Sequence, residues 1–191
     1  MDKIARLYQT IRQLDAKPIY FGLGFIQLKI NDNERFHFYH PSLLPIINIE
    51  EEVHNHRYDF VSEVLIGELN NKIYHFNPLI TGQYMKEYES CNANTILSKE
   101  EKNFTIGNLE LFSYIKINKG EKYFMDHRTF HTLETSLCMT KLHRSEYFKK
   151  YAEVVKPLYG ESICPFSLKL SENDCWNIIE QVMLQNNDTN S

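Results

Sequence analysis

Between Ile19 and His143 the chain consists of short apolar runs separated by turn residues, and this pattern constrains the fold more than any other feature. The runs are rich in Ile, Phe, Tyr and Leu, which is typical of β-strands, and the breaks include the segments 31–33 (NDN) and 118–120 (NKG). Many short strands at close spacing, without helices between them, favour an antiparallel sandwich or barrel over an α/β sheet. We expect strands near residues 19–30, 34–40, 53–57, 59–66, 71–77, 104–107, 109–117, 121–125, 129–134 and 137–143.

Helices are predicted at the two ends of the chain. Apolar residues at three- and four-residue steps indicate an amphipathic helix over residues 2–15. After His143 the pattern predicts helices again, over Glu146 to Val155 and over Cys175 to Leu184. The capping-box sequence 171–174 comes directly before the second of these helices.

The remaining segments complete the predicted organisation. Residues 80–101 show no clear period and are expected to form an extended loop or irregular hairpin between two halves of the β core, and residues 185–191 are expected to fray. The length of 191 residues fits one domain, with helix 2–15, a β core over about 19–143 and a helical tail over about 145–185.

Composition excludes several classes of function. The net charge is −4 and no long run of Lys or Arg occurs, which argues against nucleic acid as a partner. Charges interrupt the apolar positions of the first 15 residues, so neither a signal peptide nor a membrane helix is predicted there, and we expect a cytoplasmic protein. The four cysteines lack C-x-x-C spacing and are expected to be reduced thiols.

His54 and His56 are the first candidates for a metal site. Residues i and i+2 of a strand point to the same face, so the two imidazoles could bind one ion. The spacing alone is a weak motif, because solvated or core histidines would satisfy it equally well. A second histidine segment follows far downstream, at residues 120–135, and two distant strands can meet in a barrel.

These two segments resemble the motifs of the cupin superfamily, G(x)5HxH(x)3,4E(x)6G and G(x)5PxG(x)2H(x)3N, with the spacing kept throughout. In the first motif the matching positions, in order, are Asn48 for the first glycine, His54, His56, Phe60 for the glutamate and Gly67. In the second they are Gly120, Asp126 for the proline, Arg128 for the second glycine, His131 and Thr135 for the asparagine. The similarity covers about forty residues.

The resemblance implies a mainly β fold, an antiparallel double-stranded β-helix (cupin or jelly-roll) barrel with an N-terminal helix and a helical C-terminal tail. It also implies a mononuclear metal site made by His54, His56 and His131, since Phe60 replaces the glutamate that many cupins use as a ligand. A three-histidine site is similar to that of the thiol dioxygenases, cysteine dioxygenase in particular, so iron(II) is the expected metal, with zinc, nickel or manganese as alternatives.

The leading functional hypothesis is an iron-dependent dioxygenase acting on a small polar substrate such as a thiol. The alternatives are a non-oxidative isomerase or lyase that uses the metal as a Lewis acid, and a small-ligand-binding cupin with a vestigial metal site. An exposed strand edge near residues 19–30 could also pair with a second copy to form a homodimer.

Residues near the three histidines are the candidates for the substrate pocket. Tyr58 shares their strand face, and Phe60, Arg128 and His143 complete the predicted lining. Arg57 has the opposite strand parity and is expected at the surface. Whether Glu63, His75 or His127 joins the site is left open: Glu63 is expected to face outward, and the two histidines to be structural.

Overall fold

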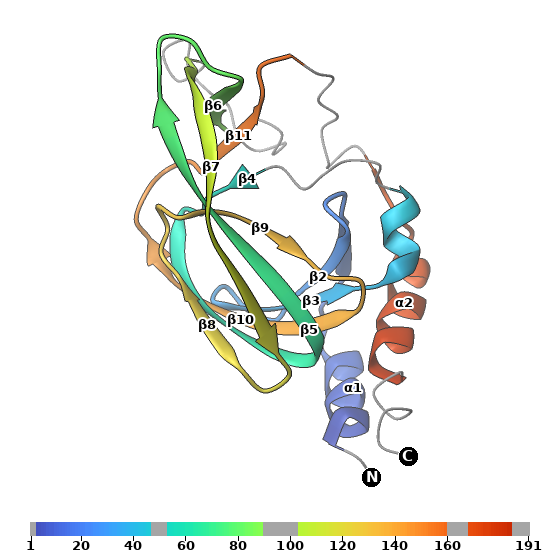
Figure 1. Ribbon diagram of the computed structural model, residues 1–191. Coiled ribbons are helices and arrows are strands. Elements are labelled where there is room, and N and C mark those ends of the chain that lie inside the picture. Colours follow the sequence, from blue (N-terminus) through green and yellow to red (C-terminus); the bar gives the residue numbers. More distant parts are fainter. Residues whose placement is uncertain (1–2, 47–52, 90–102, 160–167, 185–191) are drawn as a thin grey trace.

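The computed structural model of the chain describes residues 3–46, 53–89, 103–159 and 168–184 (Figure 1). The helices are α1 (Lys3–Gln13), a short 3-10 helix (Pro41–Ile46) and α2 (Glu172–Leu184). The strands are β1 (Pro18–Phe21), β2 (Phe25–Lys29), β3 (Glu34–Tyr39), β4 (Val53–His54), β5 (Tyr58–Pro78), β6 (Tyr84–Tyr88), β7 (Thr105–Asn118), β8 (Lys122–Met125), β9 (Phe130–Glu134), β10 (Cys138–Tyr147) and β11 (Glu153–Pro157). The prediction of a mainly β chain with a helix toward each end is therefore confirmed.

Strand β5 organises the sheet because it is long enough to have different neighbours along its two halves. Its first half pairs with β10 and β8, and its second half pairs with β7 and β9, always antiparallel. The change of neighbour occurs around Gly67, the last β5 residue that pairs with β10, whose backbone has a φ of 71°. Glycine populates this left-handed region at little cost, which suits it to the break between two ladders.

The strand pairings also form a closed ring. From β5 the hydrogen-bonded neighbours run through β7, β6, β11, β4 and β9, and β9 pairs with β5 again. Each of these strands contributes to one apolar cluster, made by Val53, Tyr74, Phe76, Tyr84, Leu109, Phe130 and Val155. Such a cluster fills the ring with side chains. The jelly-roll barrel of the cupins itself stays a prediction.

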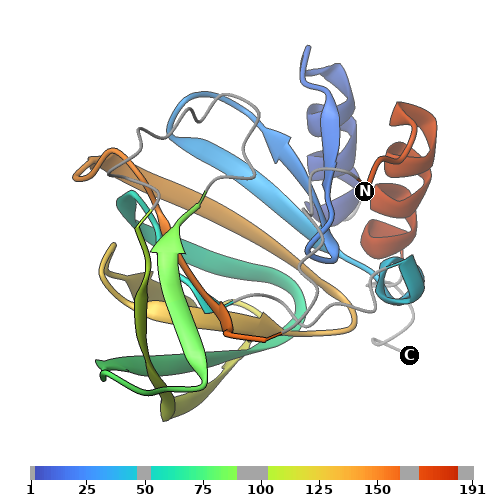
Figure 2. The ribbon, with the colours of Figure 1, turned by 90° about the horizontal axis from the view of Figure 1, so that it is seen from above.

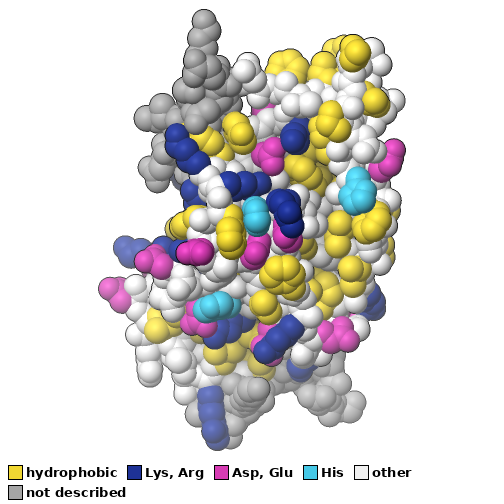
Figure 3. Space-filling view, turned by 90° about the vertical axis from the view of Figure 1, so that its left-hand side faces the viewer, with side chains coloured by type: hydrophobic (Ala, Val, Ile, Leu, Met, Phe, Trp, Pro, Cys, Tyr) yellow, Lys and Arg dark blue, Asp and Glu magenta, His cyan; other side chains and the backbone are white. Residues whose placement is uncertain are grey.

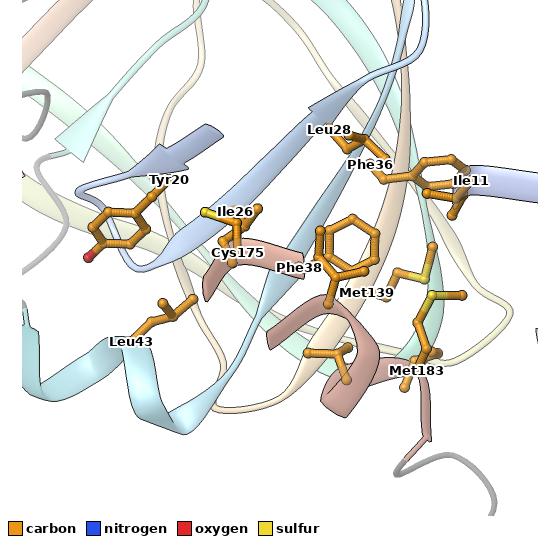
Figure 4. Close-up of a cluster of buried hydrophobic side chains, with 13 residues drawn as sticks. Ile11, Tyr20, Ile26, Leu28, Phe36, Phe38, Leu43, Met139, Cys175 and Met183 are labelled. Atoms are coloured by element: carbon orange, nitrogen blue, oxygen red, sulfur yellow. The ribbon is translucent and has the colours of Figure 1, made fainter. Parts of the chain in front are cut away.

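The largest core lies between the two long helices and the strands β1, β2, β3 and β10 (Figures 2 and 4). Ile11 of α1 and Ile179 of α2 are fully buried there, against Phe38 of β3. Burying an aromatic or branched side chain contributes roughly 1.5–3 kcal/mol, so this cluster holds the helices on the sheet. Ser171 caps α2, because the backbone N–H of Asp174 donates to its Oγ at 3.1 Å, as the capping-box sequence predicted.

Packing of the helices determines which side of β3 faces away from them. Phe36 and Phe38 lie in the helix-facing core, whereas Arg35, His37 and Tyr39 alternate with them and point to the other side. That second side is the one on which the histidine motifs meet, as described below.

Some sequence-based expectations about individual elements were wrong. The helix over Glu146 to Val155 is absent: β10 runs on to Tyr147 and β11 begins at Glu153, where Val155 pairs with β4 and β6. Hydrogen bonding of β11 to a strand on each of its edges outweighs the weak helical pattern of the sequence. The segment 80–101 was expected to be an extended loop or irregular hairpin: its described part contains β6, which pairs antiparallel with β7, and residues 90–101 lie outside the described residues. The run 19–30 is a hairpin of two strands turning at Gly24, with a φ of 93°, rather than one strand.

The predictions for Asn48, Cys91, Cys164 and residues 185–191 concern positions outside the described residues. Cys138 and Cys175 are buried free thiols, as expected. In the described part of the chain no helix has the length and apolar character needed to span a membrane. On the face shown in Figure 3, acidic and basic side chains lie interspersed among hydrophobic ones.

Candidate metal centre

The two histidine motifs meet through direct pairing of β4 with β9. His54 and His131 are opposite each other in this antiparallel pair, and His56 follows His54 by two residues. One ring nitrogen from each of the three imidazoles lies within 4.8 Å of the others. The sequence-based prediction that residue 131 joins the pair at 54 and 56 is therefore matched by a cluster that could hold a metal ion.

The spacing of the three rings fits a shared ion. The ring centroids are 4.9 to 5.1 Å apart, and Nε2 of His56 lies 2.9 Å from Nε2 of His131. Two imidazole nitrogens about 2.1 Å from one ion, at right angles to each other, are separated by about 3 Å. Without an ion, the same distance accommodates one proton between the two nitrogens as a hydrogen bond.

Asn71 orients His131 from behind. Nδ1 of His131 lies 3.0 Å from Oδ1 of Asn71, and both side chains are about 2% exposed. Because the amide oxygen only accepts, Nδ1 carries the proton and Nε2 presents its lone pair toward His56. A fixed tautomer of this kind is the usual support of a metal-binding histidine.

Burial keeps two of the imidazoles neutral. Desolvation lowers the pKa of His131 and of His56 well below the usual value of 6.5, and the neighbouring histidines lower the pKa of His56 further. Only the neutral form of imidazole binds a metal, so burial prepares both rings as ligands near neutral pH.

Phe60 and Tyr58, two of the predicted pocket residues, lie beside His56, while the pocket itself stays a prediction. The Phe60 ring meets the His56 ring edge-on, with centroids 4.9 Å apart, and the Tyr58 ring lies 5.7 Å from His56. Phe60 is buried and packs with Met125 and Leu142. An apolar side chain thus occupies the position at which the cupin motif has a carboxylate ligand.

Arg128 and His143, the other two predicted pocket residues, are placed elsewhere by the structure. Arg128 is 78% exposed and its guanidinium donates to both carboxylate oxygens of Asp126. His143 is 64% exposed and lies beside Glu34. On β10 both neighbours of His143, Leu142 and Arg144, are buried, so His143 points outward by strand alternation.

The residues left open by sequence also lie outside the three-histidine group. Glu63 pairs with Lys122 at 3.3 Å and His75 stacks on Phe112 with centroids 4.3 Å apart. His127 donates from its backbone N–H to Asp59, and its ring Nδ1 lies 2.7 Å from the same oxygen.

Asp59, Asp126 and His127 form a second group of metal-ligating type. Their polar atoms already bind one another and Arg128. These bonds explain the group as the support of a turn. Arg57 packs over the ring of Tyr147 at 4.5 Å rather than beside the histidines.

Sequence reasoning missed Arg35 and His37. Burial, with a further contribution from Arg35, lowers the pKa of His37 to about 3, and both residues lower the pKa of His56. His37 Nε2 lies 3.2 Å from the amide nitrogen of Gln27 on β2. Alternation along β3 separates these residues from Phe36 and Phe38, but it does not say which face the helices cover.

No protein-family model matches the chain, and no curated protein matches its sequence. A proposal for its function therefore depends on the geometry of the three histidines.

Replacing Asn71 tests whether it supports a metal ligand. We expect Asn71→Ala to weaken binding of Zn²⁺ or Co²⁺ about 10- to 100-fold, because outer partners of ligating histidines are worth about that much. Competition with a chromophoric chelator measures the affinity. Asn70→Ala removes the adjacent amide and should leave the affinity unchanged. Equal affinity of Asn71→Ala and the unaltered protein would show that the amide does not position His131.

Proposed function

We propose that this chain is a metal-dependent enzyme of the cupin type, in which His54, His56 and His131 hold one iron(II) ion for oxidation of a small polar substrate by O2. The observation that supports the proposal most is the three-histidine group itself, in which one ring nitrogen from each imidazole lies within 4.8 Å of the others. Structural zinc sites usually close with four protein ligands, whereas catalytic sites keep positions open.

The donor set fits iron(II) chemistry. The three imidazoles would hold iron(II) with positions left for substrate and O2, while zinc, nickel or manganese there would supply a Lewis acid.

The chain's own residues prepare the surroundings of such a site. Asn71 holds the His131 ring with Nε2 directed to the cluster, and Phe60 provides a buried apolar wall that excludes water from one side. Burial raises the pKa of Tyr58, so its phenol stays protonated at neutral pH and can donate a hydrogen bond to a bound substrate. In this proposal, these residues orient a ligand histidine, bind the substrate and exclude water.

Oxygen consumption tests the proposed reaction. Protein loaded anaerobically with iron(II) is mixed with aerobic buffer and cysteine or cysteamine, and uptake is compared with the metal-free protein and with His131→Ala. Uptake that depends on both the metal and His131 supports the oxygenase.

The native metal decides between the alternatives if there is no uptake above the metal-free control. About one zinc, nickel or manganese ion per chain in the purified protein would replace the oxygenase by an isomerase or lyase. Well under one metal per chain would indicate a ligand-binding module.

A further inference from the structure

Strand β4 is too short to hold both of the histidines at 54 and 56. It consists of Val53 and His54 alone, and β5 begins only at Tyr58, so His56 lies between the two strands. Metal ligands need to be fixed in one geometry by their surroundings. Contacts other than strand pairing therefore hold the chain on either side of His56.

On the first side, Asn55 is bound to Glu153 of β11 by three hydrogen bonds. The backbone N–H of Asn55 donates to the carbonyl oxygen of Glu153 at 3.0 Å, and its Nδ2 donates to Oε2 of the same residue at 2.7 Å. The backbone N–H of Glu153 donates in return to Oδ1 of Asn55 at 2.8 Å. Asn55 is 1% exposed, so water does not compete for these bonds.

On the second side, Arg57 is held by the same stretch of chain. Its carbonyl oxygen accepts from the backbone N–H of Phe148 at 2.8 Å and from that of Lys149 at 3.3 Å. Residues 148–153, from the end of β10 to the first residue of β11, thus bind the chain immediately before and after His56.

Two lysines support Glu153 in this position. Nζ of Lys86 lies 3.0 Å from Oε1 of Glu153, and Nζ of Lys149 lies 3.3 Å from Oε2. Burial raises the pKa of the Glu153 carboxyl, but the hydrogen bond from Asn55 and the charges of the lysines outweigh it and lower the pKa. The ionised carboxylate is a stronger acceptor for the Asn55 amide than a neutral group would be.

We propose that Glu153 is a positioning residue of the metal centre, which holds Asn55 on one side of the chain so that His54 and His56 face His131 on the other. Side chains alternate along an extended chain, so a bond to Asn55 fixes the segment without occupying the site. The inference rests on the metal site of the proposed function. It adds to that site a residue that lies 98 positions from Asn55 in the sequence.

Two substitutions of similar size separate this role from the ion pairs of Glu153. Glu153→Gln and Glu153→Met both remove the charge that pairs with the lysines, but only glutamine keeps an oxygen that accepts from Asn55. Both variants should lower Tm. We expect Glu153→Gln to bind Co²⁺ like the unaltered protein and Glu153→Met to bind it about 10-fold more weakly, as measured by competition with a chromophoric chelator.

Lys156→Met is the control, because it removes a different ion pair between β11 and β6, that of Lys156 with Glu87. It should leave the affinity for Co²⁺ unchanged even where it lowers Tm. Equal affinity of Glu153→Met and the unaltered protein would overturn the proposal. Equal weakening in Glu153→Gln and Glu153→Met would also overturn it, because the effect would then come from the lost charge.

NMR spectra of metal-free protein separate this inference from the proposed function. Failure of the folded protein to bind Co²⁺ contradicts the proposed function, and Glu153 is then tested through the ring ¹⁵N–¹H signals of histidine-labelled protein. Glu153→Met should shift the signals of His54 and His56 and leave that of the exposed His143 in place, whereas Glu153→Gln should leave all three in place. Unshifted signals of His54 and His56 in Glu153→Met would overturn the positioning role.

Discussion

His131→Ala is expected to lose the metal almost completely. His131 is buried, its Nε2 faces His56, and its Nδ1 is bound to Asn71, and among the described residues no other side chain of metal-ligating type joins this group to replace it. Outer partners alone change metal affinity about 10- to 100-fold, so removal of one of three ligands should lower it by more than about 100-fold. Equilibrium dialysis against Co²⁺ with elemental analysis measures the effect.

Two further variants make this result specific. His75→Ala removes an exposed imidazole that stacks on Phe112, and it should bind the metal like the unaltered protein. His56→Ala should lose the metal as His131→Ala does. The same loss at both positions would show that the cavity left at position 131 is not the cause. Full metal content in both His56→Ala and His131→Ala, with native circular dichroism, would remove the basis of the proposed centre.

The strand content could be predicted from the sequence because it depends on local periodicity, whereas the meeting of the two histidine segments was expected only from their resemblance to the cupin motifs. The sequence was less informative about strand length. The pattern suggested separate strands over 59–66 and 71–77, whereas β5 continues through Gly67 to Pro78. The predicted break at residues 67–70 contains a glycine, and only the partners on either edge show that the strand goes on.

The candidate site shows the same limit. Alternation along β5 placed Tyr58 and Phe60 beside His56 correctly, since all three lie on one short stretch. Arg128 was placed by its nearness in sequence to His131, yet Asp126 two residues away captures its guanidinium. Arg35 lies on β3, and β10 stands between β3 and β5 in the sheet. A local sequence pattern does not predict which strands become neighbours in this way.

Gly67→Ala should be among the most destabilising single substitutions in the β core. The φ of 71° is unfavourable for alanine by about 1–2 kcal/mol. An added Cβ would also overlap the carbonyl oxygen of Leu137 and approach the Cα of Cys138 to 3.3 Å. These are backbone atoms next to the β5–β10 ladder, so relief requires a shift of paired strands. We expect the free energy of unfolding to fall by about 3–5 kcal/mol, measured by urea denaturation.

Gly120→Ala separates the steric contribution from the backbone one. Its φ of 87° carries a similar conformational penalty, but no atom lies within 4 Å of the added Cβ. The expected loss is therefore only about 1–2 kcal/mol. The difference between the two variants measures how rigidly β10 is held against β5 at Gly67. Equal losses at the two positions would mean that this junction yields easily to the added Cβ.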